Sequence, residues 1–303
     1  MLERLAGNDA LKRELGTALH SGRLPHAVLL VGEPGCGAGF AARCLAADYL
    51  YPQGGPHAEA VLKKEDTECL VLQGEGASGQ IAVKRVREMR EAIQRSALST
   101  DAAGRVLFIY GAQNLNGSSA NAMLKIIEEP PEGVLFVLTA TSAATVLPTK
   151  TTIRSRCAAY TIAPVPTDEC AALLTREGLP ARLAQELAFL YEGHIGTALQ
   201  AFRNDTFKAA LGLAKELCSY AAQNDTYRTL VLVTKYERDR ESFLALLWQL
   251  DQLCSAVLRR PAYGAEQCGG LTPDRAARIL QVSAATRKAV TGNGNLRLAV
   301  AVF

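Results

Sequence analysis

A glycine-rich turn between two apolar stretches limits the folds open to this chain more than any other feature of the sequence. The run Ala-Val-Leu-Leu-Val at residues 27–31 is typical of a buried parallel strand. The alanine- and leucine-rich stretch that follows the turn and extends to about Tyr51 is typical of a helix. A strand, a glycine-rich turn and a helix in this order predict a βα unit with the geometry of a phosphate-binding loop.

The turn lacks the residues that hold a nucleotide in the P-loop pattern G-x-x-x-x-G-K-[ST]. Gly32 and Gly37 occupy the two glycine positions, whereas Ala38 replaces the lysine and Gly39 replaces the serine or threonine. The lysine normally reaches the β- and γ-phosphates, and the hydroxyl holds Mg²⁺. Backbone N–H groups at a helix N-terminus still attract anions. The turn, which also contains Gly35, is therefore interpreted as a vestigial P-loop, and the alternative is a plain βα turn without a ligand.

A second apolar strand, predicted at residues 106–110, carries a matching loss. A Walker B motif ends such a strand with carboxylates, one of which holds Mg²⁺ while another helps to activate water. Tyr110 and Gly111 stand at those positions. Because both losses affect the same site, we expect this chain to hydrolyse no ATP and to need no cofactor or metal.

Bulk composition excludes several classes of protein. The formal net charge of +3 over 303 residues is too small to predict nucleic-acid binding by itself. No apolar run approaches the ~18 residues that a membrane span needs, and the first residues lack the apolar core of a signal peptide. The eight cysteines form no C-x-x-C pair, so no zinc site is expected and a reducing cytoplasm fits best.

Predicted strands and helices alternate up to the sequence Ala-Pro-Val-Pro at residues 163–166, which is a candidate domain boundary. This alternation predicts a parallel sheet built from βαβ units. The predicted strands are 27–31, 67–72, 106–110, 134–139 and 158–162, and the predicted helices are 9–20, about 40–51, 81–97 and 120–129. Asn8 is the expected cap of the first helix and Ser118 or Ser119 that of the last. Residues 52–66 are expected to form a surface loop and residues 142–153 a polar connection.

Beyond the boundary the sequence is helical and strand signals vanish. Phe243, Leu247, Leu250 and Val257 form one apolar face, which Trp248 can join. Such a face indicates either a core or a subunit interface. The predicted helices begin near residue 167 and then cover 181–192, 196–202, 211–222, 229–236, 241–258 and 273–290.

One side of the predicted helix 81–97 is basic. It carries Lys84, Arg85, Arg87, Arg90 and Arg95, although Glu88 and Glu91 reduce the charge. A solvated face and a DNA-facing one are both open.

The order of motifs resembles the clamp-loader branch of the AAA+ superfamily. Residues 23–27 (Arg-Leu-Pro-His-Ala) precede the degenerate loop, and residues 121–131 (Asn-Ala-Met-Leu-Lys-Ile-Ile-Glu-Glu-Pro-Pro) resemble the family's N-A-L-L-K-x-L-E-E-P-P. Ser155, Arg156 and Cys157 match its S-R-C motif. Residues 293–298 (Asn-Gly-Asn-Leu-Arg-Leu) resemble a segment in the last helix of its collar domain. Within this branch the lost ATP-site residues are similar to those of the delta-prime family of bacterial DNA polymerase III subunits.

The resemblance implies three domains and a role in replication. An AAA+-like α/β domain with a degenerate P-loop is expected at residues 1–163, a small helical lid at 164–205, and a helical collar that builds a pentamer at 206–303. The implied function is that of a non-ATPase clamp-loader subunit, which helps to load the sliding clamp onto primed DNA. The implied partners are gamma/tau ATPase subunits, a delta subunit and, through the complex, the sliding clamp and DNA. The open alternatives are an active gamma-type ATPase and a DNA-binding adaptor outside replication.

The resemblance also implies a catalytic contribution to another chain. Arg156 is the candidate arginine finger, supplied to the ATP site of a neighbouring subunit, with Ser155 and Cys157 as its motif neighbours. The alternative for Arg156 is an ion pair at a domain edge. Arg154 is its competitor because two residues apart in an extended segment point to the same face.

Three departures from the family pattern are visible. The four-cysteine zinc module that usually follows the P-loop helix is missing, which leaves residues 52–66 without a known role. Residues 150–152 (Lys-Thr-Thr) look like a short insertion. Gly196 stands at the family's sensor-2 arginine position, and this third loss agrees with an inactive ATP site.

Overall fold

The chain folds into two compact units. The computed structural model describes residues 1–76, 79–94, 101–142, 151–292 and 294–302. Unit 1 comprises Met1–Leu173 with Gly193–Gly196, and unit 2 comprises Leu174–Glu192 with Thr197–Phe303. The predicted division into domains 1–163, 164–205 and 206–303 stays a prediction beside these two units.

Unit 1 is built on a five-stranded parallel sheet with the strand order β2-β3-β4-β1-β5. Its strands are β1 (Ala27–Val31), β2 (Cys69–Gln73), β3 (Arg105–Tyr110), β4 (Val134–Ala140) and β5 (Ala158–Thr161). β1 lies between β4 and β5, so the glycine-rich turn leaves the carboxyl edge of an interior strand. The parallel sheet predicted from the sequence is confirmed.

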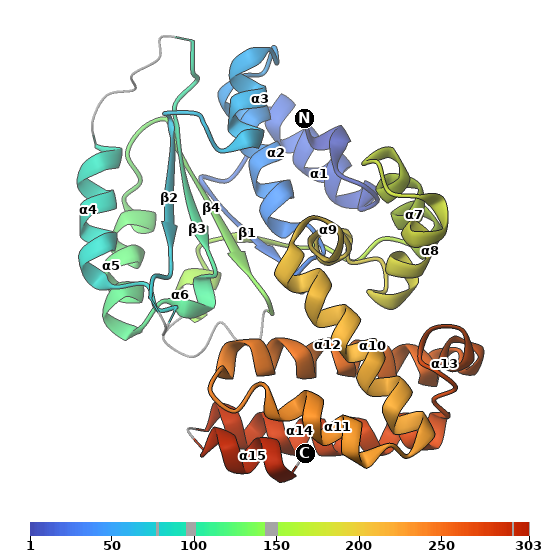
Figure 1. Cartoon of the computed structure of the whole chain (residues 1–303). Coiled ribbons are helices and arrows are strands. Elements are labelled where there is room, and N and C mark those ends of the chain that lie inside the picture. Colours follow the sequence, from blue (N-terminus) through green and yellow to red (C-terminus); the bar gives the residue numbers. More distant parts are fainter. Residues whose placement is uncertain (77–78, 95–100, 143–150, 293, 303) are drawn as a thin grey trace. The chain divides into compact units, whose positions relative to one another are not determined.

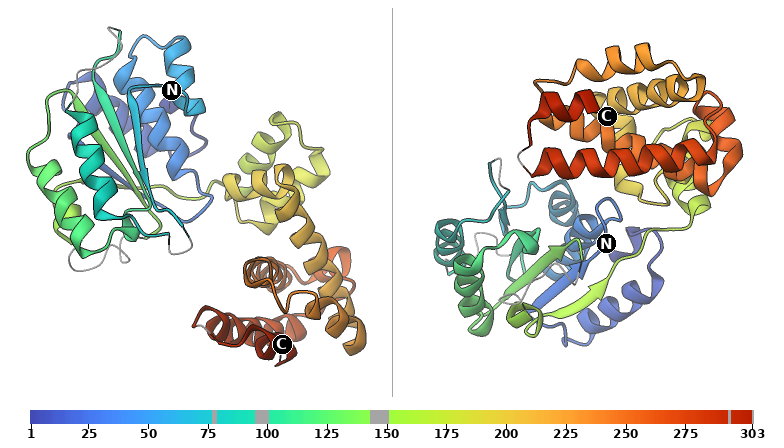
Figure 2. Two further views of the ribbon diagram at one scale, coloured as in Figure 1. Left: turned by 60° about the vertical axis from the view of Figure 1, so that its left-hand side comes forward. Right: turned by 90° about the horizontal axis from the view of Figure 1, so that it is seen from below.

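Helices cover both faces of this sheet (Figures 1 and 2). Val28 and Leu30 of β1 pack on one face with α1, α2 and α3. Ala27, Leu29 and Val31 pack on the other face with α4, α5 and α6. Both sets of side chains are buried, which explains why β1 reads as an unbroken apolar run rather than an alternating one. The helices are α1 (Asp9–His20), α2 (Ala38–Leu50), α3 (Pro56–Lys63), α4 (Val83–Ile93), α5 (Gly117–Glu128) and α6 (Thr151–Arg154); short 3-10 turns cover η1 (Leu2–Arg4) and η2 (Ala112–Asn114).

The prediction that residues 52–66 form a surface loop is wrong, because this segment contains α3. Pro56 begins the helix, where its missing N–H costs nothing. Ala58 and Val61 lie three residues apart and are buried in the apolar core that α2 also lines. The helix is only eight residues long, and the glycines and prolines at residues 52–56 are typical of a loop, so the sequence did not predict it.

The two helix caps expected in unit 1 are also wrong. Asn8 precedes α1 but has a left-handed backbone and makes no capping bond. Its side-chain amide instead donates to the carbonyl oxygen of Ala163 at 3.1 Å and accepts from the Ala163 N–H at 3.0 Å. Asn116, rather than Ser118 or Ser119, caps α5 by accepting from the N–H of Ser119 at 2.9 Å.

Parts of three predictions lie outside the described residues. The end of the helix predicted at 81–97, including Arg95, falls in residues 95–100. The predicted connection 142–153 includes residues 143–150, and its described end contains α6. Asn293 of the collar motif is likewise outside the description, although α15 (Leu296–Val302) follows it.

Unit 2 is helical and centred on α12 (Arg240–Arg259). This helix packs against α8, α10, α13 and α14. Phe243, Leu247, Leu250 and Val257 are all fully buried, so within this unit the predicted apolar face is a core. The other helices are α7 (Thr167–Arg176), which begins in unit 1, α8 (Ala181–Leu190), α9 (Ile195–Arg203), α10 (Asp205–Gln223), α11 (Thr226–Thr234), α13 (Pro261–Gln267), α14 (Pro273–Thr291) and α15.

An aromatic cluster joins the helices of unit 2. Trp248 stacks on Tyr191 with ring centres 5.9 Å apart and meets Phe207 at 5.6 Å. The Tyr191 hydroxyl donates to the buried side-chain oxygen of Gln249 at 2.9 Å. Trp248 therefore joins the apolar face, as the sequence suggested. No helix among the described residues is long and apolar enough to cross a membrane.

Candidate functional site

The glycine-rich turn closes tightly on itself at the end of β1. Gly35 and Gly37 have backbone φ angles of +88° and +103°, which favour glycine, and Gly37 directly precedes α2. A Cβ on Gly32 would lie 2.4 Å from Cys36 Sγ and 2.8 Å from the carbonyl oxygen of Ile162, so only glycine fits there. Cys36 is buried, and burial raises the pKa of its thiol. These angles and contacts explain the glycines of the turn, and its interpretation as a vestigial P-loop rather than a plain βα turn stays a prediction.

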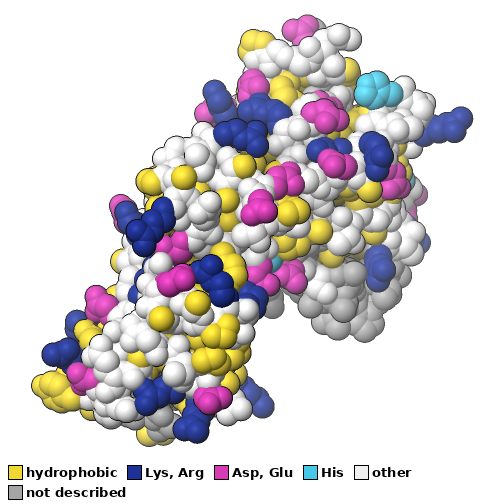
Figure 3. All heavy atoms as spheres, turned by 90° about the vertical axis from the view of Figure 1, so that its right-hand side faces the viewer, with side chains coloured by type: hydrophobic (Ala, Val, Ile, Leu, Met, Phe, Trp, Pro, Cys, Tyr) yellow, Lys and Arg dark blue, Asp and Glu magenta, His cyan; other side chains and the backbone are white. Residues whose placement is uncertain are grey.

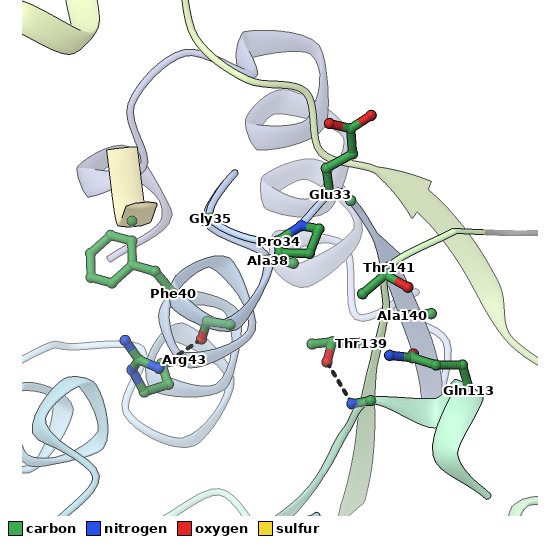
Figure 4. A pocket seen from close by; sticks show the side chains of 15 residues that line it. Glu33, Pro34, Gly35, Ala38, Phe40, Arg43, Gln113, Thr139, Ala140 and Thr141 are labelled. Carbon is green, nitrogen blue, oxygen red and sulfur yellow. Dashed lines mark hydrogen bonds between the residues drawn. The ribbon is translucent and has the colours of Figure 1, made fainter. Parts of the chain in front are cut away.

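A pocket of about 350 Å³ lies over this turn (Figure 4). Ala38 and Gly39, at the positions of the missing lysine and hydroxyl, both line it. The predicted members of the site, Gly32, Gly35 and Gly37, line it as well. The other lining residues are Glu33, Pro34, Phe40, Arg43, Gly111, Gln113, Thr139, Ala140, Thr141 and Gly196.

Arg43 supplies the cationic side chain among the described residues that line the pocket. Its Nη1 donates to the carbonyl oxygen of Gly39 at 3.0 Å, and its guanidinium lies 5.7 Å from the centre of the Phe40 ring. Figure 4 shows Arg43 and Phe40 on the same side of the turn. The Arg43 guanidinium is therefore bound to a carbonyl of its own helix. It does not occupy the position of the P-loop lysine, because that lysine would begin at residue 38. Arg43 was not singled out from the sequence, although its place one helical turn after Gly39 is a signal.

The Walker B side of the pocket carries no carboxylate on β3. Tyr110 ends the strand, and its ring stacks on Phe108 with centres 5.5 Å apart. Burial raises the pKa of the Tyr110 hydroxyl, and the nearby Arg43 opposes this to a smaller degree. The N–H of Gly111 donates to Thr139 Oγ1 at 3.1 Å, a bond drawn in Figure 4. Tyr110 and Gly111 therefore offer a phenol and a backbone amide where a working site needs acidic oxygens for Mg²⁺.

Gly196 contacts the loop directly. Its N–H donates to the carbonyl oxygen of Gly35 at 2.8 Å, and a Cβ on it would lie 3.1 Å from that oxygen. Beside it, His194 Nε2 lies 3.0 Å from Glu33 Oε2. The backbone of Gly196 therefore lies directly against the loop. A longer side chain at this position would have to fit into this close contact.

The S-R-C segment forms a turn between α6 and β5. Arg154 is the last residue of α6, and the N–H of Arg156 donates to the carbonyl oxygen of Ile153 at 3.1 Å. The expectation that Arg154 and Arg156 share one face of an extended segment is therefore wrong. Ile153 is buried in the core of unit 1, and its burial favours a helical turn in this stretch.

Arg156 forms an ion pair with a residue of the other specific motif. Its Nη2 lies 2.6 Å from Oε1 of Glu128, the last residue of α5, and its Nη1 donates to Ser155 Oγ at 3.4 Å. The side chains of Arg156 and Glu128 are 39% and 45% exposed. The two motifs that the sequence places about 25 residues apart thus meet at the surface of unit 1. Sequence reasoning did not identify Glu128 as a partner, although it belongs to the Glu-Glu-Pro-Pro motif.

The motif neighbours of Arg156 have different environments. Burial raises the pKa of the Cys157 thiol to about 12, so this cysteine stays protonated and acts as an apolar residue against the α5 layer. Ser155 is exposed, and its hydroxyl contacts the Arg156 guanidinium. Of the three predicted residues, Arg156 alone presents a charged side chain.

The basic side of α4 remains open to both interpretations. Arg85 pairs with Glu75 and Glu88, whereas Lys84, Arg87 and Arg90 are exposed. Figure 3 shows the side away from α4, where side chains of both signs are interspersed, in keeping with the small net charge.

Subunits of DNA polymerase III are among the known proteins that are similar in sequence to this chain. A protein of Mycobacterium tuberculosis (strain ATCC 25618 / H37Rv), DNA polymerase III subunit gamma/tau, is 32% identical over 180 residues, which are 57% of this chain and 30% of that protein. The chain thus spans about a third of the length of such gamma/tau relatives. Escherichia coli (strain K12) DNA polymerase III subunit delta' is 28% identical over 287 residues, which are 88% of this chain and 83% of that protein.

A solved structure supports the fold. The gamma subunit-related protein of DNA polymerase III from Thermotoga maritima superposes with a TM-score of 0.52 and 16% identity, over 91% of this chain and 99% of that one. The fold is an AAA+-like α/β domain followed by a helical region, as the sequence predicted.

The family assignment rests on the first half of the chain. The family model described as DNA polymerase III, delta subunit, matches residues 7–166, which include the P-loop turn, the Glu-Glu-Pro-Pro motif and the S-R-C motif. The resemblance to delta-prime subunits is confirmed by this match and by the E. coli relative. Because the match covers more than half of its residues, this chain belongs to the DNA polymerase III delta subunit family.

Proposed function

We propose that this chain is a clamp-loader subunit that hydrolyses no ATP itself and presents Arg156 to the ATP site of a neighbouring subunit. The observation that carries the proposal is the contrast between two places in unit 1. Ala38 and Gly39 line the pocket at the positions where the P-loop pattern has a lysine and a hydroxyl, whereas the side chain of Arg156 is 39% exposed. A guanidinium offers a permanent charge and a fixed fork of donors, which suits the oxygens of a γ-phosphoryl group in transfer.

The proposed setting is a cytoplasmic complex that loads the sliding clamp onto primed DNA. Its members would be gamma/tau ATPase subunits, a delta subunit and this chain. Similar proteins carry the names gamma/tau and delta-prime, and the resemblance to clamp loaders implies the delta subunit. Contact with the clamp and with DNA would occur through the complex. Co-purification with these subunits, followed by mass determination of the complex, tests the setting, and a chain that binds none of them would contradict it.

We expect the isolated chain to show no ATP turnover. Ala38, Gly39, Tyr110 and Gly111 occupy the positions of the groups that contact phosphate, Mg²⁺ and water. The measurement is phosphate release by purified chain at saturating ATP and Mg²⁺, with a gamma-type subunit as the positive control. Turnover at the rate of ordinary P-loop enzymes would favour the alternative, an active gamma-type ATPase. Weak anion binding would not, because backbone N–H groups of the turn permit it.

An exposed apolar face in unit 2 supports assembly through its helices. Tyr227, Leu230 and Val231 of α11 are 77%, 48% and 45% exposed, and they recur at the three- and four-residue spacing of one helix face. Leu298, 65% exposed, lies on α15, which packs against α11. Such patches are typical of interfaces with other proteins. This surface, the α11 face, is the proposed contact with neighbouring subunits.

We expect Leu230→Asp to weaken assembly while leaving the fold intact. A carboxylate in the centre of an apolar contact would lose its hydration, whereas in the free chain it is solvated. Leu258→Asp is the matched control, since Leu258 is a 44% exposed leucine on a different helix of the same unit. The measurement is co-elution with gamma/tau and delta subunits, with the helical circular dichroism of each free variant recorded alongside. Equal co-elution of both variants would remove the α11 face from the interface.

Deletion of residues 206–303 is likewise expected to leave a soluble fragment that fails to assemble. The point substitution is the sharper test. Leu187 and Leu190 of α8 belong to unit 2 and are buried, and α8 packs on α12. Removing residues 206–303 would therefore expose these leucines, and failure to assemble would have two causes.

A further inference from the structure

The ion pair between Arg156 and Glu128 concerns the position of the proposed arginine finger before it contacts ATP. The two side chains come from the turn after α6 and from the end of α5, which pack against each other within unit 1. The 2.6 Å separation between Nη2 and Oε1 is that of a short charge-assisted hydrogen bond. Nη1 meets Ser155 Oγ, so both terminal nitrogens of Arg156 have a partner on its own chain.

A carboxylate and a phosphoryl group make the same demand on a guanidinium. Both present negatively charged oxygens to the terminal N–H groups, and both fit the planar fork. A bidentate approach of a phosphoryl group to the two terminal nitrogens would meet Glu128 Oε1 and Ser155 Oγ, which already lie against these nitrogens. The contact with Glu128 therefore competes with this approach.

We propose that Glu128 holds Arg156 on the surface of its own subunit until the charge of a neighbouring ATP displaces it. This inference rests on the proposed function, because it describes the state of the finger before it engages. The hold is intramolecular and local to unit 1, and its charged partner is the Glu128 carboxylate. It assigns a regulatory role to the first glutamate of the Glu-Glu-Pro-Pro motif.

The exposure of the pair sets the strength of this hold. An ion pair between exposed side chains contributes about 0.2–1 kcal/mol, which corresponds to a factor of about 1.4 to 5 in an equilibrium constant. An arginine finger on a γ-phosphoryl group accelerates the reaction by about 10³- to 10⁵-fold. The hold is thus weak enough for the phosphoryl group to displace and strong enough for a rate measurement to detect.

The test is Glu128→Gln in the reconstituted complex of gamma/tau, delta and this chain. Glutamine keeps the size of the side chain and an oxygen acceptor but removes the charge. Because the finger is then released more easily, we expect ATP turnover to rise by about 1.4- to 5-fold over wild type. Glu129→Gln is the matched control, since it removes an equal charge from the next, exposed residue of the motif and is expected to leave turnover unchanged.

The Arg156→Ala background separates the hold from any other effect of Glu128. With no guanidinium to release, Glu128→Gln added to Arg156→Ala should match Arg156→Ala alone. A merely structural role would instead lower turnover in both backgrounds. Wild-type or reduced turnover of Glu128→Gln, while Arg156→Ala loses activity, would overturn the hold alone. Wild-type turnover of Arg156→Ala would overturn the finger itself and the hold with it.

Discussion

We expect Arg156→Ala to assemble normally and to lower ATP turnover at the neighbouring site by up to about 10³- to 10⁵-fold, with clamp loading lost in parallel. The γ-phosphoryl group carries its negative charge on equatorial oxygens during transfer, and the guanidinium is the group proposed to stabilise it. Arg156→Lys should restore little, because a point charge does not reproduce the planar fork. Assembly should persist, since the Glu128 left behind is 45% exposed and solvated.

The measurement is the ATPase and clamp-loading rate of the reconstituted complex at saturating DNA, after its composition has been verified by mass. Arg154→Ala is the control, because Arg154 ends α6 and lies two residues away in the same exposed turn region. Wild-type rates with Arg156→Ala would leave this chain a purely structural subunit. Loss of rate with Arg154→Ala instead would transfer the role to the competitor.

Much of unit 1 was predictable because its strands are buried on both faces. Burial on both faces requires unbroken apolar runs, and β1, β3 and β4 read as such in the sequence. The P-loop turn was visible for a related reason. Gly32, Gly35 and Gly37 have backbone angles or contacts that other residues do not tolerate, so their spacing records the shape of the turn.

The features that sequence reasoning missed depend on contacts across the chain. Asn8 has the chemistry of a helix cap, but Ala163, 155 residues away, offers it two backbone bonds instead. α3 is short, and only the layer that covers Ala58 and Val61 makes it a helix. The partner of Arg156 was open for the same reason. Residues 133–167 contain no aspartate or glutamate, so the partner comes from a distant segment, and the packing of α6 on α5 selects Glu128.

The candidate site could be predicted from the sequence only where the replaced residues lie next to a strand end. Ala38, Gly39, Tyr110 and Gly111 were identified by their distance from a strand end, and all but Tyr110 line the pocket. Arg43 was overlooked because it lies outside the P-loop pattern, although it follows Gly39 by one helical turn. Its contacts with Gly39 and Phe40 follow from helix geometry once α2 is known to begin at Ala38.

The largest expected effect on stability concerns a buried ion pair at the start of β3. Arg105 Nε donates to Glu68 Oε2 at 2.9 Å, and the two side chains are 8% and 0% exposed. Arg105 Nη1 also donates to the carbonyl oxygen of Ala92 at 2.7 Å, in the last turn of α4. Backbone pairing accompanies this contact, because the N–H of Val106 donates to the Glu68 carbonyl oxygen at 3.0 Å. The guanidinium therefore joins β2, β3 and α4.

We expect Arg105→Ala to lower the free energy of unfolding of unit 1 by about 3–5 kcal/mol, because it removes the cation that a buried carboxylate faces. Arg4→Ala is the matched control in the same unit. Arg4 also pairs with a glutamate, Glu59 at 2.6 Å, but these side chains are 51% and 46% exposed, so the expected loss is about 0.2–1 kcal/mol. The two variants differ mainly in the burial of the pair that is broken.

The choice of probe decides whether this effect is seen. The single tryptophan, Trp248, lies in unit 2, so its fluorescence does not report directly on unit 1. Urea unfolding followed by far-ultraviolet circular dichroism, together with hydrogen exchange of peptides from β2 and β3, measures the intended unit. Replacing both members of the pair by apolar residues, Glu68→Leu with Arg105→Met, should recover most of the loss, because no buried charge then remains. If Arg105→Ala costs no more than Arg4→Ala, the buried pair contributes no more to stability than an exposed one, and the ordering of β2, β3 and α4 must be attributed to their backbone pairing and apolar contacts.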